Sequence, residues 1–126
     1  MSKDILVKKS GIEGKGVFAK REFTNGEVVL KWNNPHELTL KEIRGLLKKD
    51  KKYISCFKGK CVLMQAPEKY VNHSCEANTY ARNFCDIAKR NIKAGEEITA
   101  DYTKEVPDLN LKCKCGSKKC KGIIKT

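Results

Sequence analysis

Three short segments decide how this chain folds, and each is rich in residues that carry chemistry: Asn72-His73-Ser74-Cys75, then Asp101-Tyr102, then Cys113-Lys-Cys115-Gly-Ser-Lys-Lys-Cys120. The first two supply an amide, an imidazole and a phenol, and the third supplies three thiols. One cysteine-rich stretch could arise by chance. Three segments of these kinds in this order indicate parts of one active site that is closed by a metal-binding tail.

The composition indicates a single globular domain. The chain has 126 residues, of which 40% are hydrophobic and 33% are charged, and this is enough for one modest core. No apolar run approaches the roughly 18 residues of a membrane span, and the first residues do not form a signal peptide. We therefore expect an intracellular, non-secreted protein with no membrane partner. In a reducing compartment its seven cysteines favour metal ligation and free thiols over disulfides.

The charge is strongly positive but unevenly distributed. The net charge of +12 is compatible with contact to nucleic acid or another polyanion, and equally with a solvated lysine surface that binds nothing specific. Residues 96–108 are the exception, with five acidic side chains against one lysine. This acidic island surrounds Tyr102.

Short runs of β-forming residues dominate the chain, and clusters of Gly, Asn, Pro or Lys separate them. We predict strands at residues 5–7, 17–19, 28–32, 53–57, 61–64, 84–88 and 98–102. Their number and spacing favour several small sheets over alternating βαβ units.

One helix is clearly indicated after residue 39. Thr39 and Glu42 have the spacing of a capping box, and Leu38 can contact Ile43 as a hydrophobic staple. The helical spacing predicts a shared apolar face made of Leu40, Ile43, Leu46 and Leu47.

The cysteine-rich tail predicts a structural zinc site. Cys113, Cys115 and Cys120 provide three thiolates, whereas structural zinc takes four nitrogen or sulfur ligands in a tetrahedron. The sequence alone leaves the fourth ligand open among Cys56, Cys61, Cys75, Cys85, His36 and His73. Where they are not the fourth ligand, we interpret Cys56, Cys61 and Cys85 as small buried hydrophobic residues. A second zinc site at Cys56 and Cys61 is the weaker alternative.

Residues 11–19 are glycine-rich and precede an apolar run. They fit either a simple β-turn or a segment whose backbone approaches a ligand closely. They do not match a phosphate-binding loop, so a nucleoside triphosphate is not expected.

Taken together, the Asn72–Cys75 segment, the run Gly95-Glu-Glu-Ile-Thr-Ala-Asp101-Tyr102 and the cysteine tail resemble the SET-domain protein lysine methyltransferases with a post-SET tail. The resemblance implies a mostly β fold with one or two short helices, in which several small sheets surround a C-terminal pseudoknot. It implies a SET domain over residues 4–103 and a post-SET zinc-binding segment over residues 109–125.

The resemblance also implies a role for each motif residue. Tyr102 falls on the catalytic tyrosine, and Cys75 on the fourth ligand of a structural zinc that Cys113, Cys115 and Cys120 complete. Lys69 and Tyr70 stand where Arg and Phe are usual, and Ala77 replaces a usual proline. The cofactor would be S-adenosylmethionine, and the residues implied to contact it are Gly14, Lys15, Gly16, Lys69, Tyr70, Asn72, His73 and Tyr102.

The substrate channel is expected to include Tyr53 and Ala100. Because side chains two apart on a strand share a face, Ala100 should lie beside Tyr102. The resemblance places Tyr or Phe at position 100, so alanine should leave room for di- or trimethylation.

The expected partner is a protein substrate whose target lysine lies in a basic context, such as a histone tail, with further contact to a nucleosome through the basic surface. That would make the protein nuclear or chromatin-associated in a eukaryotic cell, and otherwise cytoplasmic. Two alternatives are a basic zinc module that binds nucleic acid and a degenerate SET fold that serves as an interaction domain.

Overall fold

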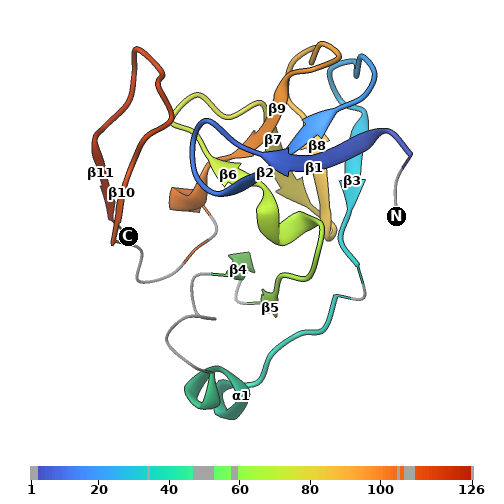
Figure 1. Cartoon of the computed structure of the whole chain (residues 1–126). Coiled ribbons are helices and arrows are strands. Elements are labelled where there is room, and N and C mark those ends of the chain that lie inside the picture. Colours follow the sequence, from blue (N-terminus) through green and yellow to red (C-terminus); the bar gives the residue numbers. More distant parts are fainter. Residues whose placement is uncertain are drawn as a thin grey trace.

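The computed structural model describes residues 3–33, 35–46, 53–57, 60–104, 106 and 110–125. Within these ranges the chain forms several small sheets, and one short α-helix lies apart from them (Figure 1). In chain order the elements are β1 (Ile5–Lys9), β2 (Lys15–Ala19), β3 (Val28–Lys31), α1 (Leu40–Gly45), β4 (Ile54–Phe57), β5 (Lys60–Leu63), η1 (Glu68–Tyr70), β6 (Asn72–His73), β7 (Thr79–Arg82), β8 (Cys85–Ala88), β9 (Glu97–Ala100), η2 (Tyr102–Lys104), β10 (Asn110–Lys112) and β11 (Ile123–Lys125). The prediction of a mostly β chain with several small sheets is confirmed.

The four-stranded sheet positions the residues of the site. Its strand order is β1-β2-β9-β6. Strands β1 and β2 are antiparallel, as are β2 and β9, and β6 runs parallel to β9 with Asn72 opposite Thr99. The glycine-rich turn before β2 and the motif on β6 are therefore held on opposite edges of one strand, β9.

The remaining sheets are smaller. Strands β3, β8 and β7 form an antiparallel sheet, and β4 with β5 and β10 with β11 form two hairpins. The tail hairpin β10–β11 lies at the side of the molecule where β6 ends (Figure 1).

The main core lies between the four-stranded sheet and the β3-β8-β7 sheet. Phe23 is 1% exposed and exchanges two backbone hydrogen bonds of 2.8 Å with Ile92. Val17 and Ile98, which face each other across β2 and β9, are fully buried. Burial of these apolar side chains is the main source of stability available to a domain of this size.

The helix begins where the capping box predicts but does not bury the expected face. Thr39 accepts a hydrogen bond from the backbone of Glu42, whose side chain accepts one from the backbone of Thr39. No residue of α1 is buried, and Leu40 is 71% exposed. The apolar face predicted for the helix is therefore not covered at Leu40, because the helix projects from the body of the protein instead of packing on a sheet (Figure 1). Leu47 lies outside the described residues.

Strand β9 is shorter than predicted. It ends at Ala100, and Tyr102 belongs to the single turn η2. The prediction that residues 100 and 102 lie on one face of a strand is therefore wrong, although both side chains line the same cavity, as described below.

No helix in the described ranges combines the length and the apolarity that crossing a membrane requires.

Candidate active site and metal centre

A cavity of about 400 Å³ lies between the four-stranded sheet and the tail. This volume is in the range of pockets that hold small molecules and cofactors. One wall is the tail segment 111–114, and the opposite wall is the turn before β2. Most of the predicted cofactor contacts line this cavity. They are Gly14, Lys15, Lys69, Tyr70, Asn72, His73 and Tyr102.

Asn72 holds the glycine-rich turn in place. Its Nδ2 atom lies 3.0 Å from the carbonyl oxygens of Glu13 and Lys15 and 3.0 Å from a carboxylate oxygen of Glu97. Gly14 adopts a positive φ of 39°, which glycine tolerates best. The side-chain amide of Asn72 therefore fixes the shape of the cavity wall.

Gly16 differs from the prediction because it does not line the cavity. A Cβ atom on Gly16 would lie 2.4 Å from Glu97 Oε2 and 2.9 Å from Ser10 Cβ. Glycine is needed at this position so that Glu97 can approach the backbone of β2 and accept hydrogen bonds from Ser10 and Asn72.

His73 connects the motif on β6 to the turn that carries Tyr102. Its ring is almost fully buried, and Nδ1 accepts a hydrogen bond of 3.0 Å from the backbone nitrogen of Tyr102. Burial lowers the pKa of His73, so the ring is neutral near pH 7 and carries its proton on Nε2. A neutral imidazole thus fixes where the backbone turns after β9.

The hydroxyl group of Tyr102 lies where two cavities meet. It donates a hydrogen bond of 2.5 Å to the carbonyl oxygen of Val71, and the ring lies 5.4 Å from the ring of His73. Tyr102, Tyr53 and Lys69 line both the large cavity and a second, narrow one.

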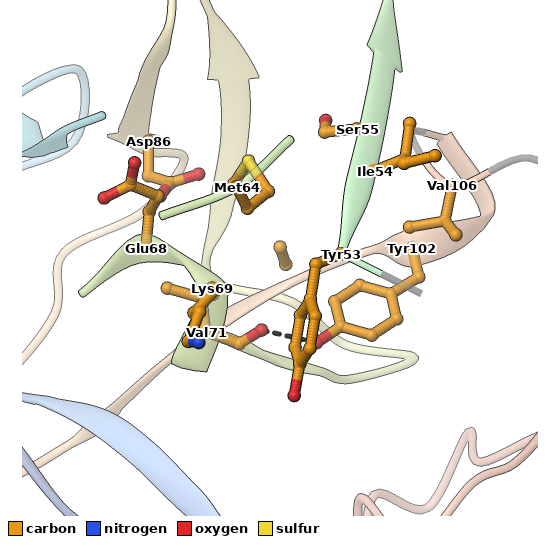
Figure 2. A pocket seen from close by; sticks show the side chains of 11 residues that line it. Tyr53, Ile54, Ser55, Met64, Glu68, Lys69, Val71, Asp86, Tyr102 and Val106 are labelled. Atoms are coloured by element: carbon orange, nitrogen blue, oxygen red, sulfur yellow. Dashed lines mark hydrogen bonds between the residues drawn. The ribbon is translucent and has the colours of Figure 1, made fainter. Parts of the chain in front are cut away.

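The narrow cavity has a volume of about 30 Å³ (Figure 2). Tyr53 and Tyr102 stand at one end, and the apolar side chains of Val71 and Val106 contribute to its walls. Ala100 also lines it and is only 3% exposed. Both predicted channel residues, Tyr53 and Ala100, therefore line the same small cavity.

Two lysines place positive charge beside the aromatic rings of the large cavity. The Nζ atom of Lys69 lies 5.3 Å from the ring centroids of both Tyr53 and Tyr70, and that of Lys15 lies 5.5 Å from the ring of Tyr70. These are cation–π distances. The ammonium groups can also attract a carboxylate of a bound small molecule.

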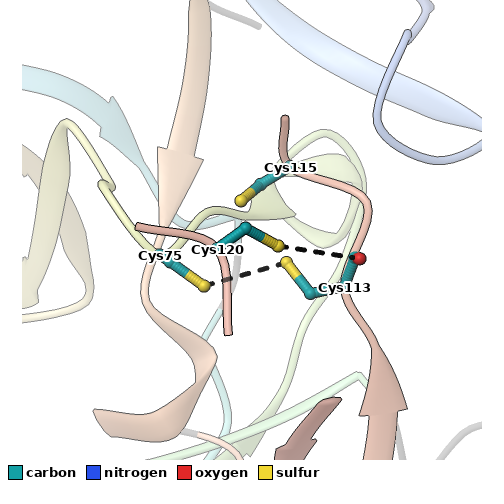
Figure 3. A group of neighbouring side chains, drawn as sticks. All are labelled: Cys75, Cys113, Cys115 and Cys120. Atoms are coloured by element: carbon teal, nitrogen blue, oxygen red, sulfur yellow. Dashed lines mark hydrogen bonds between the residues drawn. The ribbon is translucent and has the colours of Figure 1, made fainter. Parts of the chain in front are cut away.

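Cys75, Cys113, Cys115 and Cys120 form one cluster (Figure 3). Their four sulfur atoms lie within 4.8 Å of one another, and the sulfurs of Cys75 and Cys113 are 3.8 Å apart. Zinc–sulfur bonds of about 2.3 Å in a tetrahedron place the sulfurs about 3.8 Å apart. The cluster therefore fits a zinc ion, with Cys75 as the fourth ligand that the sequence alone left open.

The ionisation of the cluster also suits a cation. Desolvation and the hydrogen bonds that the Cys113 thiol donates to neighbouring sulfurs raise the pKa of Cys113 to about 12. At Cys115 desolvation acts in the same direction, but hydrogen bonds from the backbone and from the other thiols outweigh it and lower the pKa to about 6. One sulfur is thus already a thiolate near pH 7, and a divalent cation favours deprotonation of the others.

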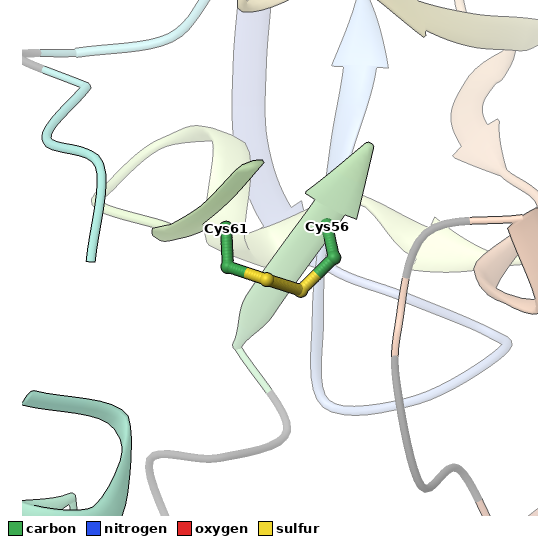
Figure 4. The surroundings of a disulfide bond; sticks show 2 residues. All are labelled: Cys56 and Cys61. Carbon is green, nitrogen blue, oxygen red and sulfur yellow. A yellow bond between two sulfur atoms is a disulfide. The ribbon is translucent and has the colours of Figure 1, made fainter. Parts of the chain in front are cut away.

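The predicted free thiols at Cys56 and Cys61 are corrected by the structure, which joins them in a disulfide across the β4–β5 hairpin (Figure 4). The two residues face each other in the hairpin register, a pairing that their spacing did not reveal. Both sulfurs are consumed, which also excludes the alternative of a second zinc site there. Cys85 remains a free thiol but is only partly buried.

The acidic island around Tyr102 mainly organises the protein itself. Its described carboxylates all accept hydrogen bonds from within the protein. Glu96 accepts from Arg90, Glu97 from Ser10, and Asp101 from Thr103. Glu105 and Asp108 lie outside the described residues.

Sequence reasoning assigned no role to Asn78, which braces the site. Asn78 is 2% exposed, accepts a hydrogen bond of 2.8 Å from the backbone of Thr99 and donates one of 2.8 Å to the carbonyl of Glu97. These bonds tie the segment after Cys75 to β9. An asparagine so close to the Asn72–Cys75 segment was the available signal.

Comparison with known proteins gives consistent matches. The family model described as SET domain matches residues 14–103. Human histone-lysine N-methyltransferase 2B is 30% identical over 142 aligned residues, which cover 94% of this chain and 5% of that protein. Histone-lysine N-methyltransferase trithorax of Drosophila virilis is 28% identical over 135 aligned residues, which cover 92% of this chain and 3% of that protein. The chain thus spans only a small part of the curated relatives that it matches.

Among solved structures, the methyltransferase domain of human histone-lysine N-methyltransferase SETMAR has a TM-score of 0.75. The sequence identity is 21%, with 94% of this chain and 56% of that chain covered. At this identity the likeness concerns the fold, and it confirms the predicted fold class.

The metal centre yields a direct prediction. Replacing one ligand by serine, as in Cys75→Ser or Cys120→Ser, should lower the zinc content from about one ion per chain to near zero, because a structural site needs four ligands. The measurement is elemental analysis of protein purified with zinc. The matched control is Cys85→Ser, a free cysteine outside the cluster, which should keep its metal. Full zinc content in Cys75→Ser would show that another residue is the fourth ligand.

Proposed function

This chain belongs to the SET-domain family, and we propose that it is an S-adenosylmethionine-dependent methyltransferase that modifies lysine side chains of a protein substrate. The observation that carries the proposal is that Tyr102 lines two cavities, one of cofactor size and one much smaller, with a volume of about 30 Å³. A nucleic-acid-binding zinc module would need neither the narrow cavity nor the buried motif on β6.

S-adenosylmethionine supplies a methyl group on a positively charged sulfur. The large cavity offers matching groups for the rest of that molecule. Asn72 and His73, which lie between the tail and the glycine-rich turn, would contact its adenine and amino-acid ends. Lys15 and Lys69 can pair with its carboxylate, and the absence of a side chain at Gly14 lets the backbone approach closely.

The target lysine would reach the site with its nitrogen at Tyr102, beside the narrow cavity. Methyl transfer is an in-line displacement by a neutral amine, so alignment of the two groups supplies much of the rate. A free lysine has a pKa of about 10.4. Apolar walls and a nearby positive sulfur both disfavour the ammonium form. The Tyr102 hydroxyl, fixed by its bond to Val71, would orient the amine.

The tail would act as a lid whose position depends on zinc. We propose that residues 109–125 form a post-SET segment after a SET domain at residues 4–103. Cys75 lies close to the motif residues Asn72 and His73, so a shared ion with the tail cysteines would hold residues 111–114 over the cavity. Ser117 also donates a hydrogen bond to Glu76, which secures the same contact.

For the substrate we propose a lysine-bearing protein, with histones as the first candidates because the relatives are named histone-lysine methyltransferases. A histone substrate would bring the protein to chromatin, where its net charge of +12 would favour contact with DNA.

Tyr102→Phe tests the proposed reaction. The change removes one hydroxyl and almost no volume, so the protein should stay folded while methyl transfer to histone peptides falls by about 100-fold or more. The measurement is transfer of a labelled methyl group at saturating donor. Tyr80→Phe, on a side chain that is 41% exposed, is the matched control and should keep its activity. Unchanged activity in Tyr102→Phe would remove this residue from the mechanism.

Ala100 predicts how many methyl groups are added. Because alanine leaves room beside the accepting nitrogen, the wild-type product should progress to di- or trimethyl-lysine. In Ala100→Tyr the phenol should fill that space and restrict the product to monomethyl-lysine. Mass spectrometry of the peptide over time measures both. A wild-type enzyme that stops after one methyl group would mean that another side chain narrows the channel.

A further inference from the structure

The narrow cavity contains a buried carboxylate that the proposed reaction has not yet used. Glu68 lies on η1, in the segment just before the Asn72–Cys75 motif, and its side chain lines the same cavity as Tyr102 and Ala100 (Figure 2). Glu68 is 2% exposed. A buried acid is costly unless its oxygens are hydrogen-bonded, so its surroundings indicate what it does.

Within the described part of the chain, one carboxylate oxygen of Glu68 has a hydrogen-bond partner and the other has none. Oε2 accepts a hydrogen bond of 2.7 Å from the backbone nitrogen of Asn33. Oε1 is buried and has no hydrogen-bond partner among the described residues. An open, buried carboxylate oxygen costs stability, and a native structure retains such a group where it serves a purpose.

The cavity has room for the missing partner. Its volume of about 30 Å³ accommodates one or two water molecules, since each needs roughly 10–15 Å³ of such space. The lining includes Ser55 and Glu68, whose polar side-chain groups can hydrogen-bond to such water. Ala100, whose side chain is small, lines the same cavity as Glu68 and Tyr102.

Other titratable groups face the same cavity but are engaged elsewhere. Asp86 on β8 accepts a hydrogen bond of 3.2 Å from the indole nitrogen of Trp32. Lys69 on η1 lies against two aromatic rings. In the described part of the chain, the other titratable groups that line this cavity are the phenols of Tyr53 and Tyr102.

We propose that Glu68 accepts, through water in the narrow cavity, the proton that the target lysine must lose before methyl transfer. This inference rests on the proposed function. One N–H bond of the ammonium group breaks and its electron pair stays on nitrogen, while the proton passes through water and forms an O–H bond at Oε1 of Glu68. The nitrogen pair then forms the new N–C bond as the C–S bond breaks and leaves its pair on sulfur. The proton on Glu68 returns to solvent before the next transfer.

The environment favours this transfer over an ion pair. In a space of low polarity, a neutral amine beside a neutral acid is preferred to an isolated ammonium beside a carboxylate. Burial also raises the pKa of Glu68, which makes its carboxylate a stronger base. Each added methyl group leaves a new alkylammonium that must again lose a proton, so di- and trimethylation depend on this route repeatedly.

The test is the pH dependence of kcat/KM for a lysine peptide at saturating donor. If the proton is taken up inside the complex, the wild-type value should be nearly level between about pH 7 and pH 9, below the pKa of free lysine. In Glu68→Gln the proton must leave to solvent, so log(kcat/KM) should rise with a slope near one. The variant should be about 1,000-fold slower at pH 7 and within about 3-fold of wild type at pH 10. Glu68→Asp should recover part of the level profile.

Stability separates this role from a structural one. Glutamine keeps an acceptor for the Asn33 amide and removes the buried charge. Folding raises the pKa of Glu68, so the protonated form of this residue stabilises the folded state. As the pH increases through that pKa the proton is lost, and at pH 8 the buried, ionised carboxylate destabilises the folded state. The Tm of Glu68→Gln at pH 8 should therefore equal or exceed that of wild type, whereas a purely structural carboxylate would give a lower Tm. Glu22→Gln, at an exposed position, should match wild type in both measurements.

The outcomes are distinguishable. A folded, zinc-loaded wild type with no methyl transfer at any pH would contradict the proposed function itself. An active wild type whose kcat/KM rises with slope one up to pH 10 would overturn the role of Glu68, even if Glu68→Gln failed to fold. A Glu68→Gln variant whose kcat/KM varies with pH as in wild type would also overturn the role of Glu68.

Discussion

The parallel pairing of β6 with β9 is the constraint on which the rest of the structure depends. It sets His73 opposite Ala100, while the other edge of β9 pairs with β2 and thereby carries the glycine-rich turn. The side chain of Asn78 adds two hydrogen bonds to the same strand. A short parallel pair is weak by itself, so burial and these side-chain bonds must fix its register. Once it is fixed, the chain leaving β9 places Tyr102 between the two cavities.

The second constraint couples the tail to this framework. Cys75 lies just after β6, so the position of the tail hairpin depends on the same strand that carries Asn72 and His73. Four sulfurs held this closely are mutually unfavourable as thiolates without a cation. Metal binding should therefore order the tail and complete the wall of the large cavity in one step. The strand pairing and the metal centre together explain why motifs far apart in the sequence converge.

Residues whose roles depend on local chemistry were predictable from the sequence, and those whose roles depend on distant neighbours were not. The capping box at Thr39 follows from spacing alone and is present. The exposure of Leu40 depends on where α1 projects, and the Cys56–Cys61 bond depends on hairpin register, so neither could be deduced. Tyr102 was identified by its motif, but the strand predicted to carry it ends at Ala100, because the backbone bends where His73 accepts the Tyr102 amide hydrogen. The open oxygen of Glu68 is visible only in three dimensions.

The central claim is that the large cavity binds S-adenosylmethionine, and calorimetric titration of that compound into the zinc-loaded protein tests it most directly. The account predicts a single site that saturates at one molecule per chain. Binding should weaken by about 10-fold or more in Asn72→Ala, because the amide that holds the cavity wall is lost. Absence of binding to a folded, zinc-loaded wild-type protein would contradict the account.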